Sequence, residues 1–311
     1  MATDCTTYTY KTVGDCAIKA DVYPPCVGER PSPVIVYLHG GCLIYGSRKG
    51  IHPVQCELYR RAGYAVVSID YRLAPESKLP DIVQDLDDAF RWVHDAGPGL
   101  CGVDPRRLAV VGHSAGGYLA LLAGCRVVPR PRAIVAFYGY GDIVGDWYSR
   151  PDPFYCRQGL VSEEESGRGT AGPAVSEPYE GRGKDRFYLY CRQRGLWPLE
   201  VGGRDPAQDP GFFVPYCPLR NVAADYPPTL LLHGDRDSDV PYEQSVLMAR
   251  ELARMQVPHE LVTLPGKEHG FDGDMQAPWM KVTFGKVLDF LAINAEPRLS
   301  EDKSSRIRTI R

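Results

Sequence analysis

The sequence predicts an α/β protein whose central sheet is mostly parallel. Six short apolar runs, rich in β-branched residues, are typical of strands buried on both faces. Segments with the period of a helix lie between several of them, and this alternation favours parallel strands joined by helical crossovers. The predicted strands occupy 32–40, 64–73, 107–114, 132–139, 228–235 and 259–266.

Two of the connecting segments have the period of an amphipathic helix. In 79–97, apolar residues recur every three or four positions, and Gly97 can end the helix. The segment 242–257 has the same spacing. The apolar positions are Ile82, Leu86, Ala89, Phe90 and Val93 in the first segment, and Val246, Leu247, Ala249, Leu252 and Ala253 in the second.

Composition excludes several classes of function. The 311 residues are 44% hydrophobic and 24% charged, with a net charge of −3, which is ordinary for a soluble globular enzyme. This charge gives no reason to expect nucleic acid or an anionic membrane as a partner. No apolar run reaches the roughly 18 residues that a membrane span needs. The polar N-terminus does not resemble a signal peptide, so we expect a cytoplasmic protein.

Ten cysteines are scattered along the chain without a C-x-x-C pair. This pattern favours reduced thiols in a cytoplasmic protein. Two widely spaced disulfides are the alternative, if the protein is secreted by an unusual route.

The strand–helix alternation is interrupted between residues 142 and 225. This stretch is rich in aromatic residues around a Gly/Ser/Arg/Glu-rich middle, "SEEESGRGTAGPAVSEPYEGRGK", which we interpret as a loop. Because strands of the same type resume afterwards, we expect one domain over 1–311 with 142–225 inserted as a cap or lid. A linker between two domains is the alternative. The aromatic side chains could line a substrate pocket or form a small core of the insertion.

Ser114 is the candidate nucleophile. It lies in Gly-His-Ser-Ala-Gly, between an apolar strand and an apolar helical run, which is the context of the G-x-S-x-G nucleophile elbow. The sharp turn strains the serine backbone, and side chains in place of the glycines would collide with it. Ser114 Oγ should therefore lie at the carboxyl edge of the sheet, where the N-terminus of the next helix favours negative charge.

A nucleophilic serine needs a histidine base, and His269 is the candidate. It lies in a loop after the last predicted strand, in the chain order Ser, Asp, His that this type of elbow uses. His39 and His233 each end a strand before a glycine, which suggests that they shape the backbone. The other four histidines look like surface, helix or supporting residues.

The acid lies in the turn "HGDRDSDVP", where Asp235, Asp237 and Asp239 alternate. Spacing alone does not choose among the three. Because alternate residues in a turn point in different directions, at most one should reach His269. The other two are expected in solvent or at the start of the following helix.

Taken together, the motifs resemble the hormone-sensitive-lipase-like (HGGG-type) esterases of the α/β-hydrolase fold. The resemblance implies an eight-stranded sheet flanked by helices, and an internal salt bridge between Asp70 and Arg72. The acid motif is instead similar to that of prolyl-oligopeptidase-like and acyl-esterase-like hydrolases. The motifs are "HGGC" with "YGS" behind it, "DYRLAPE", "DPRRLAVVGHSAGG", "HGDRDSDVP" and "EHGFD", and they span 34–271.

The resemblance also assigns residues. The acid of the peptidase-like motif lies four residues after the histidine, which corresponds to Asp237. The second and third glycines of the HGGG loop supply N–H groups to an oxyanion, and these positions correspond to Gly41 and Cys42. Ala115, next to the nucleophile, is the third donor.

Cys42 is the notable departure from the HGGG pattern. The loop needs only its N–H, and a Cβ is tolerable if φ is negative there, as related loops with alanine suggest. With Ser114, Asp237 and His269 filling the triad, a thiol nucleophile is surplus. No Cys/His spacing in the chain resembles a zinc site.

The sequence therefore predicts a serine hydrolase that cleaves a carboxylic ester of a small-to-medium hydrophobic or aromatic molecule through an acyl-enzyme. No metal or organic cofactor is required. A lactone or thioester hydrolase of natural-product metabolism is equally compatible with this chemistry. The acid motif also suggests a peptidase or an amidase as an alternative function. A non-catalytic ligand receptor is disfavoured because His269 is present in its motif. A homodimer is possible, because related folds occur as monomers and dimers.

Overall fold

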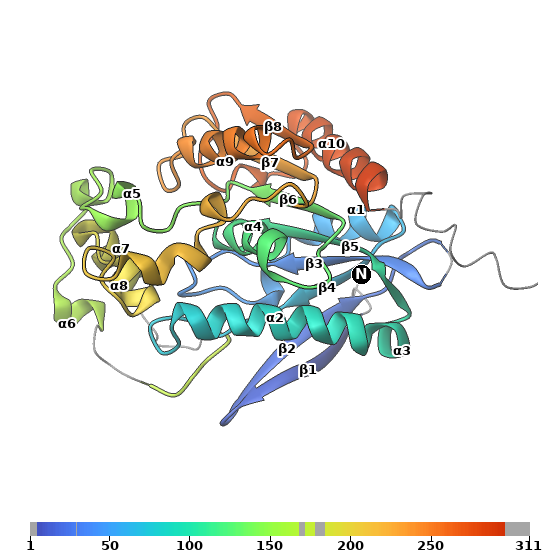
Figure 1. The fold of residues 1–311 in the computed structure, drawn as a ribbon, viewed down its shortest axis with the longest axis horizontal. Coiled ribbons are helices and arrows are strands. Elements are labelled where there is room, and N and C mark those ends of the chain that lie inside the picture. The colour runs from blue at the N-terminus through green and yellow to red at the C-terminus, as the bar shows by residue number, and fades with distance from the viewer. Residues whose placement is uncertain (1–4, 29, 168–171, 178–183, 296–311) are drawn as a thin grey trace, which may run out of the picture.

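One mixed sheet of eight strands organises the chain in the computed structural model, which describes residues 5–28, 30–167, 172–177 and 184–295 (Figure 1). The strand order is β1-β2-β4-β3-β5-β6-β7-β8. β1 pairs antiparallel with β2, and β2 antiparallel with β4, while all the other pairs are parallel. The predicted mostly parallel, eight-stranded sheet is confirmed.

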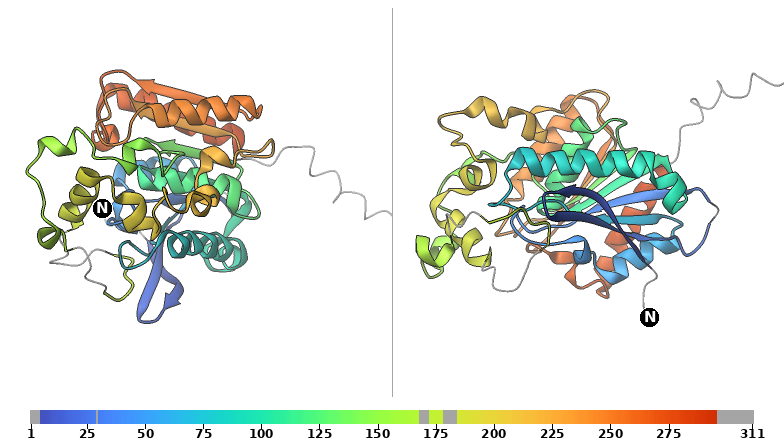
Figure 2. Two further views of the ribbon diagram at one scale, coloured as in Figure 1. Left: turned by 60° about the vertical axis from the view of Figure 1, so that its left-hand side comes forward. Right: turned by 90° about the horizontal axis from the view of Figure 1, so that it is seen from below.

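The strands contain the six predicted apolar runs and add an N-terminal hairpin, β1–β2, which projects from the sheet (Figure 2). The strands are β1 Thr6–Val13, β2 Cys16–Tyr23, β3 Ser32–Leu38, β4 Ala65–Ile69, β5 Val103–His113, β6 Ala133–Phe137, β7 Thr229–Gly234 and β8 His259–Leu264. Every residue of β3, β4, β6 and β7 is buried, as expected for strands covered on both faces.

Helices cover both faces of the sheet. Buried side chains of α2, α4 and α9 belong to the core on one face, and those of α1 and α10 to the core on the other. The two predicted helices are α2 and α9, and the apolar stripe of α2 is buried. The helices are α1 Pro53–Arg61, α2 Leu79–Asp95, α3 Gly97–Cys101, α4 Ala115–Arg126, α5 Asp146–Ser149, α6 Glu163–Ser166, α7 Lys184–Arg194, α8 Trp197–Gly202, α9 Glu243–Arg254 and α10 Pro278–Asn294.

The chain between β6 and β7 carries helices α5 to α8, which gather at one end of the sheet (Figure 1). This is the carboxyl end of the parallel strands, because Trp197 Nε1 donates to the carbonyl of Cys42, which follows β3, at 3.0 Å. Part of the predicted loop is a helix, α6, which Ser162 and Glu165 begin with a capping box. Residues 168–171 and 178–183 of that loop lie outside the described residues.

The predicted salt bridge between Asp70 and Arg72 is wrong. Asp70 accepts hydrogen bonds from Arg48 N at 2.7 Å and Arg48 Nη1 at 2.5 Å. Arg72 instead donates hydrogen bonds to the carboxylate of Asp85 in α2, from Nε at 2.7 Å and from Nη2 at 2.9 Å. The buried carboxylate of Asp85 accepts a bidentate hydrogen bond from Arg72, which Asp70, only two residues away in the chain, does not make.

Candidate active site

Ser114 lies in the sharp turn between β5 and α4. Its backbone has φ 54° and ψ −119°, a strained conformation for a residue with a side chain. A Cβ on Gly112 would lie 2.0 Å from the carbonyl oxygen of Gly116, and one on Gly116 would lie 2.0 Å from that of Leu38. The steric reason for the two glycines of the elbow is thus confirmed.

The structure brings the three predicted triad residues together. His269 lies in the loop between β8 and the short 3-10 helix η5, Phe271–Gly273. Its Nε2 is 3.0 Å from Ser114 Oγ, and its Nδ1 is 2.7 Å from Asp237 Oδ2. This geometry can move a proton from a serine hydroxyl to an imidazole whose other nitrogen is held by a carboxylate.

Asp237 is held firmly by its own turn. Its Oδ1 accepts the backbone N–H groups of Asp239 and Val240, each at 2.9 Å. His233 Nε2 lies 3.2 Å from Oδ2, and His233 Nδ1 is 2.7 Å from Ser245 Oγ. Burial works to raise the pKa of Asp237, but the contacts with His233 and His269 outweigh it and hold that pKa well below its usual value.

The sequence assigned His233 only a role in shaping the backbone, yet its ring supports the acid. The signal was present in the motif, because His233 and Asp237 are four residues apart across one tight turn. Gly234, which follows His233, has no room for a side chain, since a Cβ there would lie 2.2 Å from the carbonyl oxygen of Lys267.

The electrostatics of the site raise the pKa of His269. Burial works to lower its pKa, but the contact with Asp237 and the negative charges of Asp239, Asp237 and Asp272 outweigh that effect. The pKa of His269 therefore lies above its ordinary value. The Tyr138 ring, 4.5 Å away between centroids, packs against the imidazole.

A second carboxylate approaches the same imidazole, contrary to the expectation that only one aspartate would. Asp239 Oδ2 lies 3.5 Å from His269 Nε2, the nitrogen that faces Ser114. The third aspartate, Asp235, is exposed and accepts the N–H of Gly266 at 2.6 Å. Asp237 and Asp239 both reach the ring because the turn wraps around it, so that alternate side chains meet opposite nitrogens.

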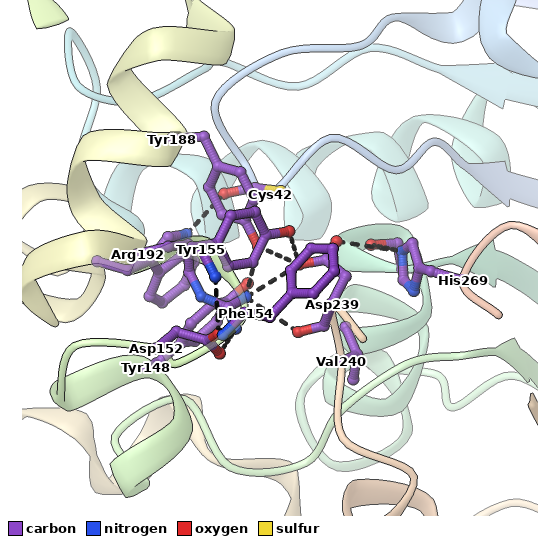
Figure 3. Close-up of polar contacts among 12 residues, drawn as sticks. Cys42, Tyr148, Asp152, Phe154, Tyr155, Tyr188, Arg192, Asp239, Val240 and His269 are labelled. Carbon is purple, nitrogen blue, oxygen red and sulfur yellow. Dashed lines mark hydrogen bonds and ion pairs between the residues drawn. The ribbon is translucent and has the colours of Figure 1, made fainter. Parts of the chain in front are cut away.

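Residues of the segment between β6 and β7 fix Asp239 (Figure 3). Its Oδ1 accepts hydrogen bonds from Tyr188 OH at 2.5 Å, Tyr155 OH at 2.8 Å and Arg192 Nη1 at 2.9 Å. Arg192, whose side chain is fully buried, also donates to Asp152 Oδ2 at 2.5 Å. Sequence reasoning missed this cluster, and no spacing within the insertion marks it.

The aromatic residues of 142–225 divide between the two predicted roles. Tyr148 stacks on Trp197 at 4.3 Å and on Trp147 at 3.6 Å, and Tyr148 and Trp197 are almost fully buried, so these rings form a small core. Tyr155 and Tyr188 instead line a cavity of about 580 Å³ together with Tyr45 and Asp239. The cavity is linked to the candidate site through Asp239, whose Oδ2 lies 3.5 Å from His269 Nε2.

The "HGGC" loop passes directly over the nucleophile, since a Cβ on Gly40 would lie 3.3 Å from Ser114 Cβ. Tyr71 holds the loop by donating to the His39 carbonyl at 2.8 Å. In the described part of the chain, the N–H groups of Gly41 and Cys42 donate no hydrogen bond. Ala115 is the first residue of α4, so its N–H has no partner within the helix.

The expected negative φ at Cys42 is wrong, because its φ is +58° and that of Leu43 is +61°. The loop turns so tightly here that the Gly41 carbonyl accepts the N–H groups of both Ile44 and Tyr45. The Cys42 thiol is buried and lies 3.6 Å from Tyr45 OH. Burial raises the pKa of this thiol well above its usual value, which makes it a poor nucleophile.

No group of three or more His, Cys, Asp or Glu side chains suited to a metal ion occurs among the described residues. Over the same residues, no helix is long and apolar enough to cross a membrane.

Two family profiles match different halves of this site. Residues 35–163 match a family described as having an alpha/beta hydrolase fold, and residues 200–292 match the prolyl oligopeptidase family. The first match contains the "HGGC" loop and Ser114, and the second contains Asp237 and His269. The chain is an α/β hydrolase by fold. The predicted combination of an esterase-like loop with a peptidase-like acid motif is confirmed.

Solved structures give the same fold for this α/β-hydrolase chain. An alpha/beta hydrolase superfamily protein from Enterococcus faecalis is 22% identical, with a TM-score of 0.72, over 94% of this chain and 100% of that one. A bacterial heroin esterase is 23% identical, with a TM-score of 0.70, over 94% and 85% of the two chains.

Curated relatives by sequence are longer proteins. A non-reducing polyketide synthase of Preussia isomera, Preu6, is 30% identical over 93% of this chain and 15% of its own length. Esterase LipC of Mycobacterium tuberculosis is 30% identical over 78% of this chain and 54% of its own length. The chain therefore spans only part of each of these relatives.

Proposed function

We propose that this chain is a serine hydrolase that cleaves carboxylic esters through an acyl-enzyme, with Ser114 as nucleophile. The observation that carries the proposal is the continuous contact from Ser114 Oγ to His269 Nε2, at 3.0 Å, and from His269 Nδ1 to Asp237 Oδ2, at 2.7 Å. Supporting it, esterases are among both the sequence relatives and the structural neighbours.

The mechanism follows from this geometry. Ser114 Oγ attacks the ester carbonyl while His269 Nε2 takes its proton, and Asp237 stabilises the imidazolium that forms. His269 then gives the proton to the leaving alcohol oxygen, which leaves Ser114 acylated. Water, activated by the same imidazole, attacks the acyl-enzyme, and the acid is released as Ser114 recovers its proton.

The N–H groups of Gly41, Cys42 and Ala115 are proposed to hold the oxyanion that forms in both steps. The closeness of the "HGGC" loop to Ser114 supports this role, as do the free N–H groups of Gly41 and Cys42. Removing one such donor typically costs about 10²–10³ in rate.

Residues 142–225 are proposed to form a cap over this site. Supporting this role, Tyr155, Leu160 and Tyr188 line the cavity next to Asp239. These side chains favour a small-to-medium substrate with an apolar or aromatic part.

A thioester substrate is the second candidate, because several of the sequence relatives are non-reducing polyketide synthases, which match 82–93% of this chain. Enzymes that assemble polyketide chains handle acyl groups, and a thioester carbonyl is open to the same attack by Ser114.

The test is covalent labelling by a fluorophosphonate probe, followed by hydrolysis of p-nitrophenyl esters, the matching thioesters and the matching anilides. We expect labelling and ester turnover in the parent protein and a loss of more than about 10³ in turnover in Ser114→Ala. Cys42→Ala must keep its label, which excludes modification of the thiol. Absence of Ser114-dependent turnover on all three classes would overturn the proposal.

A further inference from the structure

Asp239 is an acidic side chain that the proposed mechanism does not use, yet it lies beside the reacting atoms. Its Oδ1 is fully occupied by Tyr155, Tyr188 and Arg192. Its Oδ2 accepts no hydrogen bond from the described residues, and the nearest basic group is His269 Nε2 at 3.5 Å. One oxygen is thus clamped while the other is presented to the site (Figure 3).

The cluster around Asp239 carries an excess negative charge. Buried Arg192 faces two carboxylates, Asp152 and Asp239, and can neutralise only one of them. The next cation that lines the cavity, Arg186, is 60% exposed and pairs with Glu165. A carboxylate that is partly buried and not neutralised is costly unless it gains a hydrogen-bond donor or a positive charge.

Simple anchoring of the insertion does not account for this arrangement. Arg192 is already paired with Asp152, and it also donates to the backbone carbonyl of Asp239 at 3.0 Å. A neutral residue at position 239 would keep that backbone contact and avoid the excess charge. Asp239 lines a cavity with Tyr45, Tyr155 and Tyr188 on its walls, where a substrate group can enter.

The geometry also says which part of a substrate meets Asp239. His269 Nε2 must hand its proton to the leaving oxygen, which therefore lies about 3 Å from that nitrogen in the reaction. Asp239 Oδ2 is 3.5 Å from the same nitrogen. The group that reaches Asp239 is therefore carried by the leaving alcohol, a few atoms from its oxygen.

We propose that Asp239 forms a subsite for a hydrogen-bond donor, a hydroxyl or an ammonium group, on the leaving alcohol of the substrate. The inference rests on the proposed function, because it takes Ser114 and His269 as the reacting pair. Asp239 is thus a specificity-determining residue that the insertion holds in place. Substrates whose leaving group carries a carboxylate are rejected by the same charge.

The test compares four phenyl acetates that differ only at the meta position, with hydroxyl, aminomethyl, methoxy or hydrogen. In Asp239→Asn, we expect kcat/KM to fall about 10–100-fold for the hydroxyl and aminomethyl esters, because a hydrogen bond to a charged group is lost. For the methoxy and unsubstituted esters, we expect a change within threefold. Comparing each ester between the two proteins cancels its intrinsic reactivity.

Asp235→Asn is the matched control, since it removes a carboxylate from the same turn at an exposed position away from His269. It should leave all four rates unchanged. Tyr155→Phe keeps the charge and removes one donor to Oδ1, so it should lower the preference by a smaller factor, about threefold. If Asp239→Asn does not fold, Tyr155→Phe tests the same prediction.

The outcomes separate this inference from the proposed function. A selective loss on either donor ester, or on both, supports the subsite, and the larger of the two losses tells a hydroxyl site from an ammonium site. An equal loss on all four esters overturns it and assigns Asp239 an action through His269 alone. If no ester is hydrolysed, the proposed function fails. In that case, calorimetry of 3-hydroxyphenol and 3-methoxyphenol binding tests the subsite by itself. The subsite requires that the parent protein bind 3-hydroxyphenol about tenfold more tightly than 3-methoxyphenol, and that Asp239→Asn lose this difference.

Discussion

The two nitrogens of His269 meet two carboxylates from one turn, and the two are held by different parts of the molecule. Asp237 contacts Nδ1 and is fixed by His233 and by backbone N–H groups of its own turn. Asp239 lies near Nε2 and is fixed by Tyr155, Tyr188 and Arg192, from 47 to 84 residues away. The contacts that fix Asp237 thus come from the core sheet and its turn, and those that fix Asp239 come from the segment between β6 and β7, which we propose sets the environment of the leaving group.

The largest expected effect comes from the core side of this comparison. Asp237→Asn should lower kcat by about 10⁴ on every ester, because the imidazole loses the carboxylate that fixes its tautomer and stabilises its charge. On an ester without a donor group, Asp239→Asn should stay within threefold of the parent. Steady-state kinetics of both variants on phenyl acetate measure the contrast, and equal losses would abolish the division of roles.

The insertion side should show its largest effect in stability. Arg192→Met leaves two carboxylates facing each other without their cation, so we expect a loss of about 3 kcal/mol in the free energy of unfolding, measured by urea denaturation. Arg186→Met is the matched control, since Arg186 is mostly exposed and its pair with Glu165 should contribute less than about 1 kcal/mol. Similar losses in the two variants would show that the Arg192 cluster is not what fixes the insertion.

The next effect is in the pH dependence. The groups that contact the His269 ring are Ser114, Tyr138, Asp237 and Asp239. The contact with Asp237 and the charges of Asp239, Asp237 and Asp272 raise the pKa of His269. The free enzyme needs a neutral imidazole, so kcat/KM should fall as the pH drops through that pKa. Asp239→Asn removes one negative charge, lowers the pKa of His269 and should move the acid limb to lower pH.

The check is a pH profile of kcat/KM on phenyl acetate for the parent, Asp239→Asn and Asp235→Asn. The acid limb should shift only in Asp239→Asn. A shift of equal size in Asp235→Asn would show that net charge, rather than the short distance to Nε2, sets the pKa of His269.

The same comparison explains what the sequence could predict. The strands are continuous apolar runs, and the elbow depends on Gly112 and Gly116, so both are determined by local sequence. Ser114 and His269 could be proposed together because each follows a parallel strand of one sheet, and the carboxyl ends of these strands meet at one edge. The choice of Asp237 among the three aspartates of its turn depends only on the resemblance to peptidase-like hydrolases.

What could not be predicted depends on residues far apart in the chain. The partner of Arg72 is on α2, and those of Asp239 are in the insertion, whose fold no periodicity marks. Cys42 has a positive φ in a loop where its own carbonyl accepts a hydrogen bond from Trp197, 155 residues later in the chain. In each case the neighbouring residues in the sequence do not distinguish between the alternative partners or backbone conformations, and tertiary packing determines which one occurs.

Cys42 joins the two sides of the comparison and should show the smallest effect. Its carbonyl contacts Trp197 of the insertion and its thiol contacts Tyr45 of its own loop, while its N–H is proposed to face the oxyanion. Because Cys42→Ala keeps the N–H and the Cβ, we expect kcat/KM within about threefold of the parent. Cys42→Pro should cost orders of magnitude, since proline lacks the N–H and cannot adopt a φ of +58°. Cys42→Gly separates these two causes, because it keeps the donor and accepts the positive φ, so it should stay active. A near-complete loss in Cys42→Ala would instead give the thiol a role in the reaction.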